Sequence, residues 1–230
     1  MSLNMEGIFE QQRMLMVTEQ IERRGLISPR LLEAFRRVPR HCFVPLDLQQ
    51  LAYTDGPLSI GDGQTISQPY IVALMTSLAA LQGDENVLEV GTGSGYQAAI
   101  LACLAKTVHT LERFASLANR ARQLLVQRGF INVQVHEGDG TLGWVEAAPY
   151  QAVLITAAAP RPPKPLLEQL CEGGRLVLPV GDRNAQNLQV WTRQGGHFTT
   201  ESIIPVSFVP LRGKHGWNEE HWPDHSIFSF

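Results

Sequence analysis

Cysteine is scarce in this chain of 230 residues. The three cysteines, Cys42, Cys103 and Cys171, are odd in number and far apart. Their spacing matches neither a disulfide framework nor the Cys/His patterns of zinc sites, so no metal site is predicted. We expect buried free thiols in a reducing cytosol.

Long apolar runs and an excess of positive charge are also missing. The longest apolar run is too short to span a bilayer. Glu6 and Glu10 stand where a secretory signal would have its basic and apolar regions, so we expect a cytoplasmic protein that does not bind membranes. The net charge of -3 and the isoelectric point of about 6.2 argue against a nucleic-acid partner. A peptide or a small molecule fits this composition better.

The length and the 44% apolar content predict one globular domain over residues 1–230. Residues 1–60 are predicted to form a helical and irregular segment packed on the rest. It has an amphipathic helix over 8–24, closed by Gly25, and a second helix that starts at Pro29 with Ser28 as its N-cap. The tail 214–230 is polar with scattered aromatics, and the pattern does not assign it.

From residue 69 onward, helical and strand patterns alternate. This alternation predicts an α/β fold, a doubly wound and mostly parallel sheet with helices on both faces. Two consecutive strands, 188–192 and 198–208, follow as an antiparallel hairpin around the glycine pair at 195–196. The predicted parallel strands are 86–90, 107–111, 133–136, 152–155 and 175–178, and the predicted helices are 69–81, 96–105, 114–128 and 166–170.

A glycine-rich turn follows the first of these strands. Gly91, Gly93 and Gly95 form the pattern G-x-G-x-G between a buried strand and a helix. Glycines there let backbone N–H groups approach a nucleotide-like cofactor. The dinucleotide fingerprint would need a glycine at Tyr96, which disfavours a dehydrogenase, and no Walker lysine follows the turn.

Two acidic positions extend this site. Glu112 lies about 20 residues beyond the turn, where a carboxylate can accept hydrogen bonds from ribose hydroxyls. Asp139, followed by Gly140, ends the third strand, where it either accepts from an adenine amino group or forms an ordinary Asp-Gly turn. Together these features resemble the Rossmann-like methyltransferases that use S-adenosylmethionine. In that class the acidic residue before the turn, here Glu89, lies near the methionine end of the cofactor, and the sheet ends in an antiparallel hairpin.

The segment 61–70 carries information about the substrate. It is a glycine-flanked polar loop before a helix that starts near Pro69, and the N–H groups at such a helix start favour an anion. Thr65 and Ser67 add hydroxyl donors, so the loop could hold a substrate carboxylate. Simple N-capping by Ser67 is the alternative, and the residues alone do not decide between the two.

The chain resembles the protein-L-isoaspartate O-methyltransferases over nearly its whole length. The resemblance rests on the segments 53–58 (YTDGPL), 64–69 (QTISQP), 88–96 (LEVGTGSGY), 138–140 (GDG), 143–144 (GW), 156–160 (TAAAP), 173–181 (GGRLVLPVG) and 208–211 (FVPL). The second and last of these are the specific ones; the glycine turn alone is not.

The resemblance implies an enzyme that repairs damaged proteins. Such enzymes methylate the free α-carboxylate of L-isoaspartyl residues in proteins and peptides, converting S-adenosylmethionine to S-adenosylhomocysteine, and the ester then cyclises to a succinimide. Ser67 matches the family's active-site serine. The implied cofactor contacts are Gln64, Thr65, Ile66, Ser67, Glu89, Gly91, Gly93, Gly95, Glu112, Asp139 and Gly140. We expect a monomer, and residues near 212–217 to contribute as well.

One position departs from the family pattern. Gln151 stands where the family usually has an aspartate. Glutamine keeps an acceptor and loses the charge, so we expect a structural or tolerant role there.

A carboxylate substrate explains why no catalytic His/Asp or Cys/His pair is needed, because it is already ionised near neutral pH. The protein must align the carboxylate oxygen with the methyl carbon and its sulfur. Ser67 is expected to orient the carboxylate, and the strand 206–211 to bind an extended peptide by its backbone. The alternatives are a methyltransferase for another small acid or modified peptide, and a non-catalytic binding module.

Overall fold

A seven-stranded sheet forms the centre of the computed structural model, which describes residues 2–218 and 220–222. The strands lie in the order β5-β4-β3-β6-β7-β8-β9. Those from β3 to β7 pair in parallel, and β8 and β9 continue the sheet as an antiparallel hairpin, as predicted. The strands are β3 Asn86–Val90, β4 Thr107–Glu112, β5 Val133–Glu137, β6 Tyr150–Ile155, β7 Leu170–Gly181, β8 Gln186–Gln194 and β9 His197–Val206.

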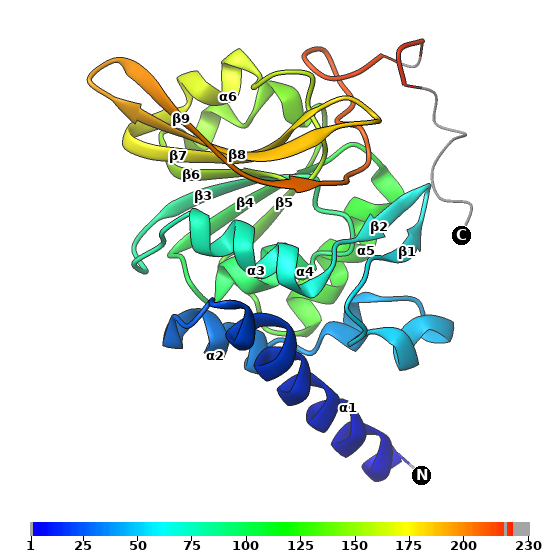
Figure 1. Cartoon of the computed structure of the whole chain (residues 1–230). Coiled ribbons are helices and arrows are strands. Elements are labelled where there is room, and N and C mark those ends of the chain that lie inside the picture. The colour runs from blue at the N-terminus through cyan, green and yellow to red at the C-terminus, as the bar shows by residue number, and fades with distance from the viewer. Residues whose placement is uncertain (1, 219, 223–230) are drawn as a thin grey trace.

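Helices cover both faces of this sheet. Figure 1 shows α3 and α4 below the sheet and α6 above it. Strand β3 is hydrophobic on both faces, with Val87, Leu88 and Val90 buried, as a covered parallel strand requires. The helices are α3 Pro69–Leu78, α4 Tyr96–Ala102, α5 Ala115–Gln127 and α6 Lys164–Glu168.

The sheet topology places a crevice at the ends of β3 and β6. After β3 the chain goes outward to β4 and β5, then returns to the opposite side of β3 as β6. The connections therefore leave β3 and β6 in opposite directions. Ligands of open α/β sheets bind at such a switch point, outside the carboxyl ends of the strands.

The N-terminal segment is helical, but not as one regular helix. Helix α1 Ser2–Met16 continues as a π-helical turn, Val17–Ile21, and a 3-10 turn, Glu22–Arg24, and ends at Gly25 with φ +92°. Helix α2 Pro29–Arg37 starts where predicted. Ser28 occupies its N-cap position, as predicted, although its side chain makes no capping hydrogen bond.

The irregular stretch after α2 is ordered, as expected, and contains two further 3-10 turns, Arg40–Phe43 and Leu46–Leu51. The Arg40 guanidinium is fully buried and lies 5.0 Å from the Tyr96 ring centroid, while Phe43 meets that ring edge-on. One hydrophobic cluster joins Phe9 of α1 to Leu125 of α5. This shared core supports our proposal that residues 1–230 form a single domain.

A β-hairpin replaces the loop predicted around residue 62. Strands β1 Leu58–Gly61 and β2 Gln64–Ile66 pair antiparallel, separate from the main sheet. The turn residues Asp62 and Gly63 both have positive φ, +52° and +67°. Asp-Gly is a favoured dipeptide for such a two-residue hairpin turn, so the sequence contained the signal and our interpretation missed it.

The structure gives Gln151 a structural role. Its side-chain oxygen accepts a hydrogen bond of 2.8 Å from the backbone N–H of Asn86, where β3 begins beside β6. An acceptor is all that this contact needs, which explains why an uncharged glutamine is compatible with it.

The tail is partly described. Trp222 is buried and packs edge-on against Trp217, with ring centroids 5.7 Å apart. Arg212 donates to the carbonyls of Trp217 and Asn218, at 3.2 and 2.9 Å. Residues 223–230, which include Phe228, lie outside the described residues. Nowhere in the described chain is a helix both long enough and apolar enough to cross a bilayer.

Candidate active site

The glycine turn connects β3 to α4 with a backbone that side chains would obstruct. Gly91, Gly93 and Gly95 all have positive φ, +99°, +51° and +87°. A Cβ atom on Gly91 would lie 2.4 Å from Oγ1 of Thr156 at the end of β6, and one on Gly93 would lie 3.3 Å from Cδ1 of Ile60 in β1. The glycines therefore let β6 and the hairpin approach the turn closely.

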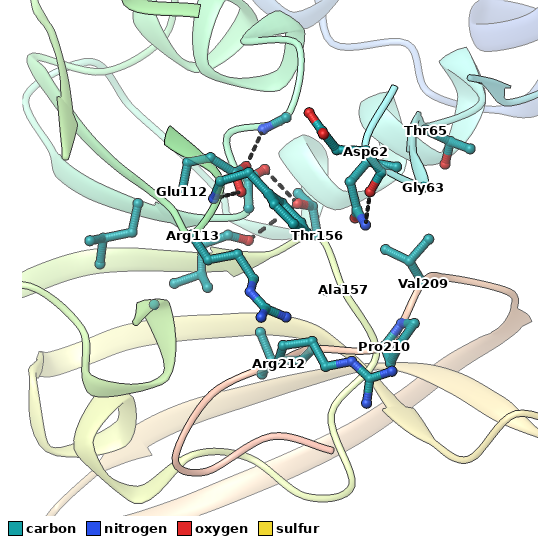
Figure 2. A pocket seen from close by; sticks show the side chains of 18 residues that line it. Asp62, Gly63, Thr65, Glu112, Arg113, Thr156, Ala157, Val209, Pro210 and Arg212 are labelled. Atoms are coloured by element: carbon teal, nitrogen blue, oxygen red, sulfur yellow. Dashed lines mark hydrogen bonds between the residues drawn. The ribbon is translucent and has the colours of Figure 1, made fainter. Parts of the chain in front are cut away.

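A cavity of about 310 Å³ opens beside this turn. Figure 2 shows Glu112 and Arg113 on one side of it, Asp62, Gly63 and Thr65 on the other, and Thr156 between them. Its size suits a small molecule. The lining residues are Asp62, Gly63, Gln64, Thr65, Val90, Gly91, Gly93, Leu111, Glu112, Arg113, Phe114, Gly140, Thr156, Ala157, Val209, Pro210, Leu211 and Arg212.

Glu112 lies at the end of β4 with its carboxylate in this cavity wall. The side chain is buried and accepts two backbone hydrogen bonds, from Gly93 N–H at 2.8 Å and from Phe114 N–H at 3.0 Å. The hydrogen bond from Gly93 therefore holds the glycine turn against the end of β4. Each carboxylate oxygen has a second lone pair for a further donor. Its contact with ribose hydroxyls stays a prediction.

Asp139 has a different setting from Gly140. Gly140 lines the cavity, where a Cβ would lie 2.4 Å from Cγ1 of Val90, but Asp139 is not among the lining residues. One Asp139 oxygen caps the turn at Thr141, accepting from its N–H at 2.9 Å, and the other accepts from Lys214 N–H at 2.8 Å. Burial alone would raise the pKa of Asp139, but these N–H groups outweigh it and lower the pKa. The structure thus places Asp139 as a tether for the tail, and an adenine contact stays a prediction.

Glu89 is completely buried beneath the turn. Its carboxyl accepts a 2.6 Å hydrogen bond from Thr110 Oγ1, which lies 2.6 Å from Thr92 Oγ1. Burial raises the pKa of Glu89 to about 8; the Thr110 bond opposes this rise, and the charge of Glu112 adds to it. Glu89 faces a smaller cavity of about 40 Å³ that Ser67 also lines.

The segment 64–67 lies where two larger cavities meet. Gln64 and Thr65 line the cavity beside the glycine turn, and Ile66 and Ser67 line the small one above Glu89. Thr65 and Ser67 also line a groove of about 450 Å³ that continues along residues 205–209. Ser67 is half-buried, and no hydrogen bond of its side chain occurs within the described chain.

The N-capping alternative for Ser67 does not hold. The N-cap of α3 is Gln68, and no side chain caps this helix. The Gln68 amide donates instead to Oδ1 of Asp55 at 2.8 Å. The Ser67 hydroxyl is therefore available to a molecule in the groove.

Sequence reasoning missed several cavity residues. Thr156 supports the glycine turn directly, because its hydroxyl donates to the carbonyl oxygen of Gly91 at 2.8 Å. Its place at the carboxyl end of the strand beside β3 was a signal that could have identified it. Asp62 and Gly63 belong to the predicted polar loop 61–70 but were not named as cofactor contacts. Arg113 had no such signal, since it lies between the end of β4 and the start of α5. Of the expected 212–217 group, Arg212 lines the cavity.

Within the described residues, no cluster of three or more His, Cys, Asp or Glu side chains could hold a metal ion. The site consists of a backbone cradle, buried carboxyls and a serine beside a groove.

Comparison with known proteins agrees with this architecture. The family model described as protein-L-isoaspartate(D-aspartate) O-methyltransferase matches residues 10–216. A protein named protein-L-isoaspartate O-methyltransferase from Syntrophus aciditrophicus is 54% identical over 213 residues, covering 91% of this chain and 98% of that protein. One of the same name from Trichlorobacter lovleyi is 53% identical over 210 residues, with 91% and 97% covered.

Solved structures show the same fold. A protein-L-isoaspartate O-methyltransferase superposes with a TM-score of 0.80 at 25% identity, over 90% of this chain and 67% of that one. A Plasmodium falciparum protein in complex with S-adenosyl-L-homocysteine superposes with a TM-score of 0.77 at 24% identity, over 87% and 98% of the two chains. On the family match and the sequence identities, this chain belongs to the protein-L-isoaspartate O-methyltransferase family.

Proposed function

We propose that this chain transfers the methyl group of S-adenosylmethionine to the free α-carboxylate of L-isoaspartyl residues in damaged proteins and peptides. Membership of the family supports this activity. The structural observation that carries it is the junction of two cavities. The cavity beside the glycine turn and the groove along residues 205–209 share Thr65 and Thr156, so a cofactor and a peptide can meet there.

The residues beside the glycine turn fit the cofactor. Gly91 and Gly140 both line the cavity, and a Cβ on either would lie 2.4 Å from a side-chain atom of Thr156 or Val90, so glycine at both positions preserves the close packing of the cavity wall. Glu112 offers carboxylate oxygens for ribose hydroxyls, and the backbone of the turn faces the same space. When bound, S-adenosylmethionine supplies a methyl group activated by its positive sulfur. We propose as its contacts Gln64, Thr65, Ile66, Ser67, Glu89, Gly91, Gly93, Gly95, Glu112, Asp139 and Gly140.

The proposed reaction depends on the alignment of the reacting atoms more than on proton transfer. A bond forms between a carboxylate oxygen and the methyl carbon, and the bond between that carbon and sulfur breaks. The substrate carboxylate is ionised at neutral pH, so no side chain has to remove a proton. We propose that the Ser67 hydroxyl donates to one carboxylate oxygen and leaves the other in line with the methyl group. The resulting ester then cyclises to a succinimide without help from the enzyme.

The groove offers a binding surface for an extended peptide. Strand β9 is the last strand of the sheet, so its outer backbone edge has no neighbouring strand within the described sheet. Residues 209–211 are already taken, because the N–H of Ala158 donates to the Val209 carbonyl and that of Leu211 donates to the Ala158 carbonyl, both at 2.8 Å. Phe208 is also taken, because its N–H donates to Oε1 of Gln186 at 2.7 Å and its carbonyl accepts from Nε2 of Gln186 at 3.1 Å. Strand addition at residues 206–207 is therefore the narrower form of our proposal. Backbone contacts would tolerate many side chains, as a repair enzyme requires.

We further propose a cytoplasmic monomer whose partners are isoaspartyl proteins, with no need for nucleic acid or membranes. Cys42, Cys103 and Cys171 are unpaired thiols, which supports a reducing compartment. Light scattering coupled to size exclusion measures the mass of the assembly directly.

Transfer of labelled methyl to an isoaspartyl peptide tests the activity, with the aspartyl peptide of the same sequence as control. We expect label in the isoaspartyl peptide only, and its release by mild base because the product is an ester. Equal labelling of both peptides would favour the second candidate, a methyltransferase for other carboxylates. Base-stable label would refute ester formation, and binding of the cofactor without transfer would favour a non-catalytic module.

A further inference from the structure

The hairpin β1–β2 forms a wall of the cavity but is weakly built on its own. Asp62, Gly63, Gln64 and Thr65 all line the cavity, and Ile60 reaches the glycine turn at Gly93. The two strands pair only with each other. Ile60 and Ile66 are buried in the hydrophobic core and hold the base of the hairpin, whereas the turn residues Asp62 and Gly63 are exposed. An isolated two-stranded hairpin is marginally stable in water, so the position of this tip depends on what else holds it.

Helix α5 holds the tip of this hairpin through two side chains. The Ser116 hydroxyl donates to Oδ2 of Asp62 at 2.8 Å, and the Arg120 guanidinium donates to the carbonyl oxygen of Ile60 at 2.6 Å. Ser116 and Arg120 are four residues apart, so they project from the same face of the helix. The two hydrogen bonds hold the end of β1 and the turn against α5.

The same helix also starts at the opposite wall of the cavity. Its first residue, Ala115, follows Phe114, whose N–H donates to the Glu112 carboxylate at 3.0 Å. The rigid element that carries Ser116 and Arg120 is thus anchored to the cavity carboxylate. A shift of the hairpin away from α5 would widen the cavity between Glu112 and Thr65.

We propose that Ser116 and Arg120 are positioning residues that latch the β1–β2 hairpin over the cofactor cavity and set how long the cofactor and its product stay bound. The proposal rests on the proposed function only in the identity of the cofactor. Ser67 follows the buried Ile66 at the base of the hairpin, so the latch at the tip does not hold the residue that orients the substrate. Loss of the latch weakens cofactor binding while the chemistry at Ser67 remains possible.

Three variants test the latch: Ser116→Ala, Ser116→Ala combined with Arg120→Met, and Ser116→Thr, which keeps the hydroxyl. Ser77→Ala is the matched control, because Ser77 is also an exposed helical serine and lies outside the cavity lining. The full-length protein is titrated with S-adenosylhomocysteine, and the dissociation rate is measured by rapid mixing. Hydrogen exchange reports on the amides of residues 60–66.

We expect the Kd for S-adenosylhomocysteine to rise about fivefold in Ser116→Ala and about twentyfold in the double variant, through faster dissociation. Ser116→Thr and Ser77→Ala should match the wild type. Exchange in residues 60–66 should speed up in the double variant, KM for S-adenosylmethionine should rise with Kd, and kcat should not fall. Thermal stability without ligand should change little, because Ser116 and Asp62 are exposed.

Wild-type dissociation rates in the double variant would overturn the proposal, and so would a failure of Ser116→Thr to behave like the wild type. Failure of the proposed function is visible separately. If the wild type binds S-adenosylhomocysteine but does not methylate an isoaspartyl peptide, the substrate assignment fails while the dissociation measurements still decide on the latch.

Discussion

The glycine turn and the β1–β2 hairpin face each other across the cavity, yet they are held in different ways. The turn is fixed by backbone contacts in the core: Gly91 N–H donates to the Leu111 carbonyl at 2.8 Å, and Gly93 N–H donates to Glu112 at 2.8 Å. The tip of the hairpin is held by side chains at the surface, Ser116 and Arg120. The turn lies within the core, whereas the hairpin is anchored in the core at Ile60 and Ile66 and is held at its exposed tip by these surface side chains.

The glycine turn and the hairpin therefore suit different roles in the site. A cofactor needs a preformed cradle, which buried backbone supplies with little freedom to move. A protein substrate of variable sequence needs access, and elements with few buried contacts open most easily. Substitutions in the glycine turn should therefore abolish tight cofactor binding, whereas substitutions at the latch should weaken it moderately, through faster dissociation.

Gly91→Ala should have the largest expected effect on cofactor binding. The new Cβ meets Thr156 Oγ1 at 2.4 Å, and alanine resists a φ of +99°. We expect affinity for S-adenosylhomocysteine to fall about hundredfold, measured by calorimetry. Gly129→Ala is the control, because Gly129 also has positive φ, +79°, but open space around its Cβ. It should lower thermal stability and leave binding intact. Retained affinity in Gly91→Ala would contradict the tight cradle.

Ser67→Ala should separate turnover from cofactor binding. The hydroxyl lies beside the groove and supports neither α3 nor the hairpin by a hydrogen bond. We expect kcat to fall about hundredfold through poor alignment of the carboxylate, while the Kd for S-adenosylhomocysteine stays within about twofold. Ser207→Ala, in the same groove but outside the cofactor cavity, should have a much smaller effect. Full activity of Ser67→Ala in the methyl-transfer assay would remove its assigned role.

The difference between local backbone structure and contacts between distant segments also explains what could be predicted from sequence. The parallel strands and the glycine turn are local consequences of apolar runs and of the conformation that glycine permits, and the structure confirms both. The role that we propose for the Ser67 hydroxyl could be named only through the family resemblance, because the residues alone left capping open.

What sequence could not show depends on contacts between distant segments. The Asp139 carboxylate accepts a hydrogen bond from the backbone N–H of Lys214, 75 residues later, and no local sequence pattern predicts this contact. The contacts of Ser116 with Asp62 and of Arg120 with Ile60 likewise join segments 54 and 60 residues apart. The hairpin is a different case, since Asp62 and Gly63 were readable as a turn.

Glu89 affects stability and not binding or turnover, and it tests how well water is excluded from the protein beneath the glycine turn. Its pKa is raised to about 8 by burial, so between pH 5 and pH 8 the folded protein holds a proton that the unfolded chain has released. This contribution therefore makes the wild type less stable as pH rises through that window. Glu89→Gln cannot ionise and should lose the slope, so the difference in unfolding free energy between variant and wild type should shift in the variant's favour from pH 5 to pH 8.

Glu85→Gln supplies the opposite sign. Burial would raise the pKa of Glu85, but the N–H groups of Gln82 and Gly83 lower it, so its stabilising contribution is present above the pKa of the unfolded chain and is lost as pH falls. Urea unfolding at pH 5, 7 and 8 measures the Glu89→Gln difference, and further measurements below pH 4.5, the ordinary pKa of a glutamate, measure the Glu85→Gln difference. A Glu89→Gln difference that does not change with pH would mean that the carboxyl is ionised in the folded protein. The wall beneath the glycine turn would then hold charge, and its contrast with the surface hairpin would rest on backbone contacts alone.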